Sequence, residues 1–462
     1  MNRKQLHRLG LRSGPALDAA VGACIAAARA GLSRAEIRRA VQAIIDNPHT
    51  HQDDPIWSPV ALALLGPEAA VAVDSGSEAP WRSWGHELDP ASIRQMEQAC
   101  RLPIAVRGAL MPDAHVGYGL PIGGGLATDG AVIPYAVGVD IACRVRMSVL
   151  DLPTDWLADR PELFREALEA ETRFGVGATF RKPRQHAVMD EDWGVSPVTR
   201  AEKKTAWAQL GTSGSGNHFV EFGELTVNRE DLGLPEGRYL ALLSHSGSRG
   251  VGNKVATYYS NLASQQHPEL PADLRHLAWL TLDRAEGAEY WSAMELMGRY
   301  AAANHSLIHS WVSRHLGAEV LWSLENHHNF AWKEVHDGVE RVVHRKGATP
   351  AGAGILGIIP GSMASLTHIV RGLGNEHSLR SAAHGAGRLM SRSAAKKRFR
   401  WSDVEPLLRA RGVELISAGL DEVPMVYKDI DRVMAEQSDL VESLGTFMPC
   451  MVKMAPAASG RG

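Results

Sequence analysis

The sequence predicts an α+β fold in which one large mixed-sheet domain follows a helical N-terminal extension. Apolar residues before residue 51 recur at helical spacing. From about Arg101, short β-branched runs alternate instead with glycine-rich turns and helical segments. Glycine, at 45 of 462 residues, exceeds its usual share of about 7%. We therefore expect the helical extension at 1–50, a connecting region at 51–100 and the large domain at 101–462.

The first fifty residues are expected to form two helices. The apolar face of the first is made by Leu17, Val21, Cys24, Ile25 and Ala28. Gly31 suits the position just past its C-terminus. Ser33 and Glu36 then have the spacing of a capping box, and Asn47-Pro48 should end the second helix. The apolar face of that helix is made by Ile37, Val41, Ile44 and Ile45.

Strands and helices alternate in the large domain. We expect strands at Ala131–Pro134, Arg144–Leu150 and Tyr239–His245. The longest helical pattern runs from about Asp283 to His315, with Gly317 just beyond it. The stretch from Phe174 to Lys204 is polar and is expected to form loops. This alternation favours one large domain over several separate ones.

Composition excludes several classes of protein. With 49 Lys and Arg against 52 Asp and Glu, the net charge of −3 argues against nucleic-acid binding through overall positive charge, although it allows a local basic site. Four widely spaced cysteines without a CxxC pair predict neither a disulfide framework nor a zinc ribbon. No apolar run approaches the roughly 20 residues of a membrane span, and the N-terminus lacks a signal-peptide core. We expect a cytoplasmic protein.

One group of residues could bind metal. Asp140 and Cys143 are three residues apart and could reach one metal, or the thiolate could bridge two; alternatively, they are a capping Asp beside a buried Cys. His218, His245 and His328 lie in loops flanked by small residues, where each alone could be an ordinary surface or hydrogen-bonded histidine. Together the five offer sulfur, nitrogen and oxygen ligands compatible with Zn, Mn, Fe or Co.

Two glycine-rich segments could approach phosphate. Residues 239–259 read as strand, glycine-rich turn and helix, whose first amides would attract an anion. In HGAGR, His384 and Arg388 precede a helical pattern from Leu389 to Phe399, so His384 would face bound phosphate unless the segment is only a tight turn. Basic clusters at 344–346 and 388–400 could bind a phosphodiester backbone, or the second could be a solvated helix face.

Nine segments occur in the order typical of one family: MPDAHVGYGLPIGG, AVIPYAVGVDIAC, GNHFVE, HSGSRGVG, HHN, HRKGAT, IPGSM, HGAGRLMSR and VPMVYKDID. Over Met111 to Lys453, about three quarters of the chain, the sequence resembles the RtcB-type RNA ligases. The resemblance implies an RtcB-like catalytic domain at 101–462. It also implies that RNA ending in 3′-phosphate or 2′,3′-cyclic phosphate is joined to RNA with a 5′-hydroxyl, in RNA repair or tRNA splicing, with GTP and Mn²⁺.

The same resemblance implies roles for particular residues. His384 would be the nucleophile that GTP guanylylates. Two Mn²⁺ ions would be held by Asp140, Cys143, His218, His245 and His328, with Cys143 bridging. Nucleotide binding would involve Asn217, Phe219, Glu221, Asn329, Pro360, Gly361, Ser362, Met363, Thr367, Gly385, Ala386, Gly387, Tyr427 and Lys453. Candidates for RNA-phosphate contacts are Arg345, Lys346 and Arg388.

Several positions depart from the family pattern. Ala142 and Ala364 stand where the family usually has Gly, Thr367 stands for Ser and His305 for Arg. These changes spare the ligands and the nucleophile, and we expect a divergent branch of the family. Its partners would be RNA with broken ends and an archease-type activator, and we expect a monomer. The alternatives are a metal-dependent RNA-end phosphodiesterase or phosphatase without ligation, and a non-catalytic protein that binds RNA ends.

Overall fold

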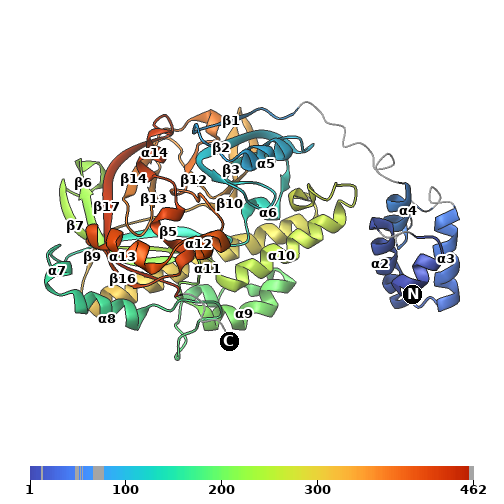
Figure 1. Cartoon of the computed structure of the whole chain (residues 1–462), viewed down its shortest axis with the longest axis horizontal. Coiled ribbons are helices and arrows are strands. Elements are labelled where there is room, and N and C mark those ends of the chain that lie inside the picture. The colour runs from blue at the N-terminus through green and yellow to red at the C-terminus, as the bar shows by residue number, and fades with distance from the viewer. Residues whose placement is uncertain (12–13, 47–50, 52–53, 55, 66–77, 457–462) are drawn as a thin grey trace. The chain divides into compact units, whose positions relative to one another are not determined.

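The computed structural model describes residues 1–11, 14–46, 51, 54, 56–65 and 78–456 (Figure 1). It divides into two compact units, one formed by Met1–Ser77 with His267–Pro271 and the other by Glu78–Gln266 with Ala272–Gly462. The predicted α+β class is confirmed. Part of the region expected to connect the domains, β1 (Trp81–Ser83) and α5 (Pro90–Cys100), belongs to the second unit.

The first unit consists of helices, among them both of those that the sequence predicts: α1 (Arg3–Arg8), α2 (Pro15–Arg29), α3 (Arg34–Asp46) and α4 (Ser58–Leu65). The Ser33–Glu36 capping box forms, with the Glu36 amide donating to Ser33 Oγ at 3.3 Å. The predicted face of α2 is partly wrong, because Ile25 is 51% exposed and alanines such as Ala27 line the buried side instead. The predicted stop at Asn47-Pro48 lies outside the described residues.

Two large sheets form the frame of the second unit. The strands of the five-stranded sheet are, in spatial order, β1, β2 (Ala105–His115), β3 (Ile122–Thr128), β11 (Val339–Lys346) and β10 (Asn329–His336). Those of the eight-stranded sheet are β13 (Leu356–Ile359), β14 (Thr367–Gly372), β17 (Val441–Met454), β6 (Phe219–Val227), β7 (Gly237–Ser246), β5 (Arg144–Leu150) and β9 (Val320–His327), with β16 (Glu414–Ser417) pairing with β17. Two short pairs are β4 (Ala131–Val132) with β8 (Leu280–Thr281) and β12 (Ala348–Pro350) with β15 (Ser381–Ala383).

Helices complete the second unit. They are α6 (Pro134–Val137), α7 (Trp156–Asp159), α8 (Pro161–Glu171), α9 (Pro197–Gln209), α10 (Arg249–Gln266), α11 (Ala285–Leu316), α12 (Arg392–Arg398), α13 (Trp401–Ala410) and α14 (Ile430–Ala435). The long helix α11 matches its prediction, and Gly317 ends it in the left-handed conformation at φ 65°. Among the residues that the structure describes, no helix is both long and apolar enough to span a bilayer.

Two predictions of local structure are wrong. The stretch expected to be loops contains the start of α9, which begins at Pro197 after the N-cap Ser196. The strand expected at Ala131–Pro134 ends at Val132, because Pro134 starts the short helix α6. Pro is favoured at the first position of a helix, so both helix starts carried a signal that the polar or β-branched neighbours obscured.

The core of the second unit lies on both faces of the eight-stranded sheet. Side chains alternate along β7, so that Leu240 and Leu242 pack with Phe164 of α8 and Ile308 of α11. Leu243, on the opposite face, packs in a second cluster with residues of β5, β6 and β14. This sandwiching holds the strands in fixed register, and their ends carry the predicted ligands.

Candidate active site

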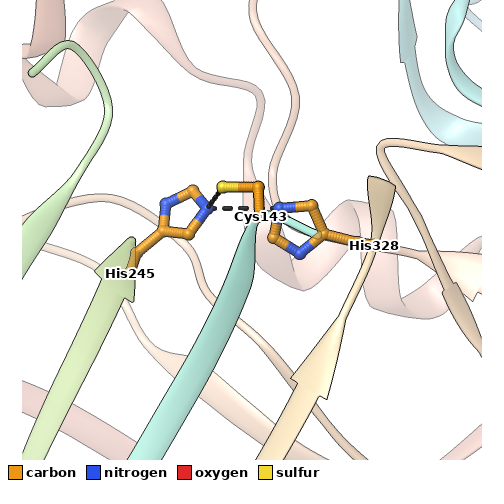
Figure 2. A group of neighbouring side chains, drawn as sticks. All are labelled: Cys143, His245 and His328. Carbon is orange, nitrogen blue, oxygen red and sulfur yellow. Dashed lines mark hydrogen bonds between the residues drawn. The ribbon is translucent and has the colours of Figure 1, made fainter. Parts of the chain in front are cut away.

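Three antiparallel strands of the eight-stranded sheet bring Cys143, His245 and His328 together. Within the ladder, Val145 of β5 lies opposite His245 of β7, and Arg144 lies opposite His327 of β9. Cys143, just before β5, and His328, just after β9, therefore reach the same edge as His245. The three side chains point toward one another (Figure 2). Cys143 Sγ is 3.0 Å from His245 Nε2, which is 3.2 Å from His328 Nε2.

A second group shares Cys143. His218 directly precedes β6, whose first residue lies opposite His245. Nε2 of His218 is 2.9 Å from Asp140 Oδ2 and 3.4 Å from Cys143 Sγ. Within each group the ligand atoms lie within 4.8 Å of one another. The structure thus brings all five predicted ligands together, with the thiol common to both groups.

Hydrogen bonds set the two groups up differently. His245 Nδ1 donates to the Asn217 carbonyl at 3.1 Å, so the lone pair of Nε2 faces Cys143 and His328. At His218, Arg249 Nη2 donates to Nδ1 at 3.1 Å, so Nε2 carries the hydrogen and donates to Asp140. The first group therefore presents free imidazole nitrogen, whereas a cation in the second requires the hydrogen of His218 to move from Nε2 to Nδ1.

The protonation states suit cation binding. Burial lowers the pKa of His245 and His328 well below 6.5 and keeps both rings neutral. Although burial raises the pKa of Asp140, the hydrogen bond from His218 and the positive charge of Arg249 hold it well below its usual range. Burial and the negative charge of Asp140 raise the pKa of the Cys143 thiol well above 9. Neutral imidazole, carboxylate and sulfur form a donor set that fits a divalent transition metal.

Binding of a cation should therefore release about one proton at neutral pH, from Cys143, because the thiolate is the ligand. Between pH 6 and 8 the affinity for Mn²⁺ should rise about ten-fold per pH unit. Calorimetric titrations in two buffers of different ionisation enthalpy measure the proton count. The variant Cys100→Ala, which removes a buried thiol of α5, should leave that count unchanged. A pH-independent affinity would contradict this protonation state.

His384 lies beside this cluster. It follows β15, and its ring centroid is 4.8 Å from that of His328. Its Nδ1 donates to Asp113 Oδ2 at 2.6 Å, and its backbone N–H donates to the same oxygen at 3.2 Å. Since Nδ1 carries the hydrogen, Nε2 is the nitrogen left with a lone pair. The side chain of Asp113 is fully buried, and that of His384 is 15% exposed.

Sequence reasoning missed Asp113 and Arg249. Asp113 stands alone as a carboxylate within the buried strand β2, and that isolation was the available signal. Arg249 begins α10 with φ 60°, a conformation that non-glycine residues rarely adopt. Neither pairing with a histidine could be read from spacing, because 271 and 31 residues separate the partners.

The HGAGR segment forms a tight turn rather than a helix start. The predicted helix from Leu389 is shorter, since α12 begins at Arg392 after its N-cap Ser391. His384 therefore lies outside the N-terminus of that helix. Gly387 adopts φ 73°, and a Cβ there would lie 2.1 Å from the Asp113 carbonyl oxygen. The glycine lets the turn pack against β2 and so places His384 on Asp113.

The residues predicted to bind the nucleotide occupy segments that meet around this turn. Residues 360–363 contact 385–387, with the Ala386 amide donating to the Pro360 carbonyl at 3.1 Å. Phe219, Met363 and Tyr427 pack in one apolar cluster. Asn217 bonds His245 through its carbonyl. The predicted nucleotide-binding residues in these segments are Asn217, Phe219, Pro360, Gly361, Ser362, Met363, Gly385, Ala386, Gly387 and Tyr427.

The four remaining nucleotide candidates lie on the strands or beside them. Asn329 accepts from the Gly347 amide at 2.8 Å, and buried Thr367 begins β14. Glu221 and Lys453 lie on the paired strands β6 and β17, where Val452 is opposite Glu221. Burial raises the pKa of Glu221 well above 4.5 and lowers the pKa of Lys453 to about 8. Lys453 Nζ donates to the Leu168 carbonyl at 2.9 Å.

The three candidates for RNA-phosphate contacts are all engaged within the protein. Lys346 is 7% exposed and donates to the Tyr118 carbonyl, and burial lowers its pKa to about 7. Arg388 pairs with Glu422 at 2.9 Å. Arg345 is 1% exposed, and its guanidinium bonds Glu334 at 2.6 and 3.0 Å. This burial does not fit a phosphate contact for Arg345, so we withdraw that prediction.

Arg345 should instead be structural. The substitution Arg345→Ala breaks the buried ion pair with Glu334, which keeps His336 as a partner, and should lower the free energy of unfolding by about 3–5 kcal/mol. Chemical denaturation measures the loss. The matched control is Arg341→Ala on the same strand, whose partner Asp129 is 70% exposed and whose loss should cost about 1 kcal/mol or less. Equal effects of the two substitutions would refute the structural role.

Comparisons with known proteins find similar sequences over most of the chain. A family model described as tRNA-splicing ligase RtcB matches residues 95–195 and 185–454. The chain is 36% identical over 408 residues to the RNA-splicing ligase RtcB of Escherichia coli (strain K12), covering 80% of this chain and 95% of that protein. It is 32% identical over 421 residues to the tRNA-splicing ligase RtcB of Thermococcus kodakarensis, covering 74% and 86%. It is 30% identical over 428 residues to the RNA-splicing ligase RtcB of Mycobacterium bovis, covering 77% of this chain and 98% of that protein.

Proposed function

The chain belongs to the RtcB family of tRNA-splicing ligases and is an RNA ligase, and on that premise we propose its chemistry. It joins RNA 3′-phosphate or 2′,3′-cyclic phosphate ends to 5′-hydroxyl ends, uses GTP and two Mn²⁺ ions, and proceeds through a guanylylated His384. One observation carries the proposal: His384, oriented by Asp113, lies next to a cluster of five metal-capable side chains.

The first step would be guanylylation. The Nε2 lone pair of His384 attacks the α-phosphorus of GTP, a P–N bond forms, and the bond to the β-phosphate oxygen breaks, releasing pyrophosphate. The imidazole becomes cationic as it is guanylylated. Asp113, bonded to Nδ1 at 2.6 Å, holds the tautomer that exposes Nε2 and stabilises this charge.

The following steps would consume the guanylate. An oxygen of the RNA 3′-phosphate attacks the phosphorus held on His384, and the P–N bond breaks. The RNA 5′-hydroxyl then attacks the activated 3′-phosphorus, forms the phosphodiester and releases GMP. A 2′,3′-cyclic phosphate end must first be opened by water to the 3′-phosphate.

Asp140, Cys143, His218, His245 and His328 would hold the two cations. Bound there, the ions would neutralise phosphate charge and align the leaving group. The fit rests on the free Nε2 lone pair of His245 between Cys143 and His328. The second group fits once the hydrogen on His218 moves from Nε2 to Nδ1, which would end the hydrogen bond that Nδ1 accepts from Arg249.

Label transfer tests the proposal. The protein is incubated with Mn²⁺ and GTP labelled at the α-phosphate, and acid-labile label on the chain is measured, followed by ligation of RNAs with defined ends. We expect label on the wild type and none on His384→Ala. A protein that processes RNA ends without GTP and without label would instead be the phosphodiesterase or phosphatase. Label that persists on His384→Ala would refute the assigned nucleophile.

The finer physiological assignments rest on the resemblance alone. We propose RNA with broken ends as substrate, in RNA repair or tRNA splicing, and an archease-type activator as partner. A cytoplasmic monomer stays the prediction for the protein's location and assembly.

A further inference from the structure

An exposed indole shares a surface hollow with two lysines near the end of α9. Trp207 is 38% exposed and is one of the large hydrophobic residues that the described part of the chain leaves open to solvent. It borders a hollow of about 390 Å³, within the usual range for small ligand sites. The hollow is lined by Lys182, Pro183, Gln185, Lys204, Trp207 and Ala208.

The helix orients this face toward solvent. The buried residues of α9 are Thr199 and Ala206, which direct one side of the helix into the protein. Lys204 and Trp207 are three residues apart and so are neighbours on the helix surface. Lys182 comes from the segment that precedes α9, and the chain at Lys182 is neither helix nor strand.

Neither lysine is neutralised. Within the described part of the chain, neither Lys182 nor Lys204 is in an ion pair, and no ring or cation packs on Trp207. Lys254 of the adjacent α10 differs, because it pairs with Glu202 of α9 at 2.7 Å. The hollow therefore combines a free aromatic surface with two unpaired positive charges.

The chain that lines the hollow continues from the end of α9 to the candidate active site. Gln209 follows Trp207 by two residues, and its Oε1 lies 3.8 Å from where a Cβ of Gly250 would be. The neighbouring Arg249 bonds the ligand His218. Past α9, the chain continues through residues 211–217 to His218 itself.

We propose that Trp207, Lys182 and Lys204 form a subsite for one base and its flanking phosphates of the single-stranded RNA whose end enters the active site. The inference rests on the proposed function. An indole stacks on any base, and lysines neutralise the phosphates on either side, so this subsite would bind RNA without sequence preference. An acidic protein segment would match the lysines but would leave the indole without a planar partner.

Steady-state ligation tests the subsite. The substrate has 3′-phosphate and 5′-hydroxyl strands about 12 nucleotides long, a typical single-strand site length. For Trp207→Ala we expect the KM for RNA to rise about five-fold to hundred-fold, the loss of one stacked base, with kcat nearly unchanged. Trp207→Phe keeps a stacking surface and should restore most of the affinity. With dinucleotide ends, which stop short of the subsite, the wild type and Trp207→Ala should have equal KM values.

The lysines are tested by salt dependence. Removing Lys182 and Lys204 together should reduce the slope of log affinity against log salt by about 0.7 for each phosphate that a lysine no longer neutralises. The double variant Lys4→Ala/Arg38→Ala, which removes two exposed positive charges of the first unit, is the charge-matched control and should leave the slope unchanged.

The failures of the two proposals are distinguishable. If the wild type neither labels His384 nor ligates, the proposed function fails. If the wild type ligates and Trp207→Ala has an unchanged KM for the long RNA, the subsite alone is refuted. An increase that Trp207→Phe does not reverse, or one equally large with dinucleotide ends, would also refute stacking. Binding of an acidic peptide that competes with RNA and requires Trp207 would assign the hollow to a protein partner.

Discussion

Replacing Cys143 by alanine is expected to abolish ligation, with a loss of about 10³-fold or more. The thiol is the one side chain common to both groups of metal-capable residues, so the substitution removes a ligand from each cation at once. Metal ions contribute several kcal/mol of transition-state stabilisation, and each 1.36 kcal/mol corresponds to ten-fold in rate. Loss of His328 alone would affect one group only and should cost less.

The measurement combines single-turnover ligation with the stoichiometry of bound Mn²⁺. We expect Cys143→Ala to fall from two tightly bound ions to none, while its melting temperature without metal stays near that of the wild type. Cys100→Ala removes a thiol that is equally buried but lies in α5, and it should retain both ions and full activity. Activity of Cys143→Ala within ten-fold of the wild type would refute the shared-ligand assignment.

The substitution Asp113→Asn should slow guanylylation of His384 by about 10²–10⁴-fold. Asparagine has nearly the shape of aspartate, but it carries no charge to stabilise the cationic ring, and its amide can favour the wrong tautomer. Because Asp113 is fully buried and contacts His384 rather than the nucleotide, the binding of GTP should change little. The loss should therefore appear in the rate of label transfer and hardly in the GTP concentration needed for half-maximal rate.

Two further measurements separate orientation from unfolding. Asp113→Asn should keep the circular dichroism spectrum of the wild type, and should bind Mn²⁺ with unchanged stoichiometry because Asp113 is outside both metal-capable groups. A ten-fold weaker GTP affinity with an unchanged rate of transfer would place Asp113 in nucleotide binding instead. A rate close to that of the wild type would show that His384 needs no carboxylate.

The five metal-capable residues and His384 could be picked out from the sequence, but their arrangement could not. Ordered motifs identified Cys143, His245 and His328, whereas their spacing along the chain left open whether they meet. Their meeting depends on the register of three strands that are distant in sequence, and sequence pattern alone does not specify which strands are neighbours. Asp113 was not predicted as a site residue, because a lone carboxylate in a strand becomes significant only through its tertiary partner.

Basic residues were the least predictable feature. The run at 344–346 was predicted as a cluster that could bind a phosphodiester backbone, but its side chains are buried, so the charge of Arg345 must be paired internally. Arg345 bonds Glu334 for this reason. Conversely, the start of α9, the helix that carries Lys204 and Trp207, was predicted to be a loop. The charged and small residues of that stretch favoured a loop, although Ser196 and Pro197 are signals of a helix start.

The register that brings the ligands together also couples cation binding to folding. In an unfolded chain, Cys143 and His328 are separated by more than 180 residues of sequence, and closing such a loop is entropically unfavourable. The cluster can exist only after β5, β7 and β9 have paired. A bound cation therefore stabilises the folded state by mass action. A chain in which these strands have not paired has no site that can bind the cation.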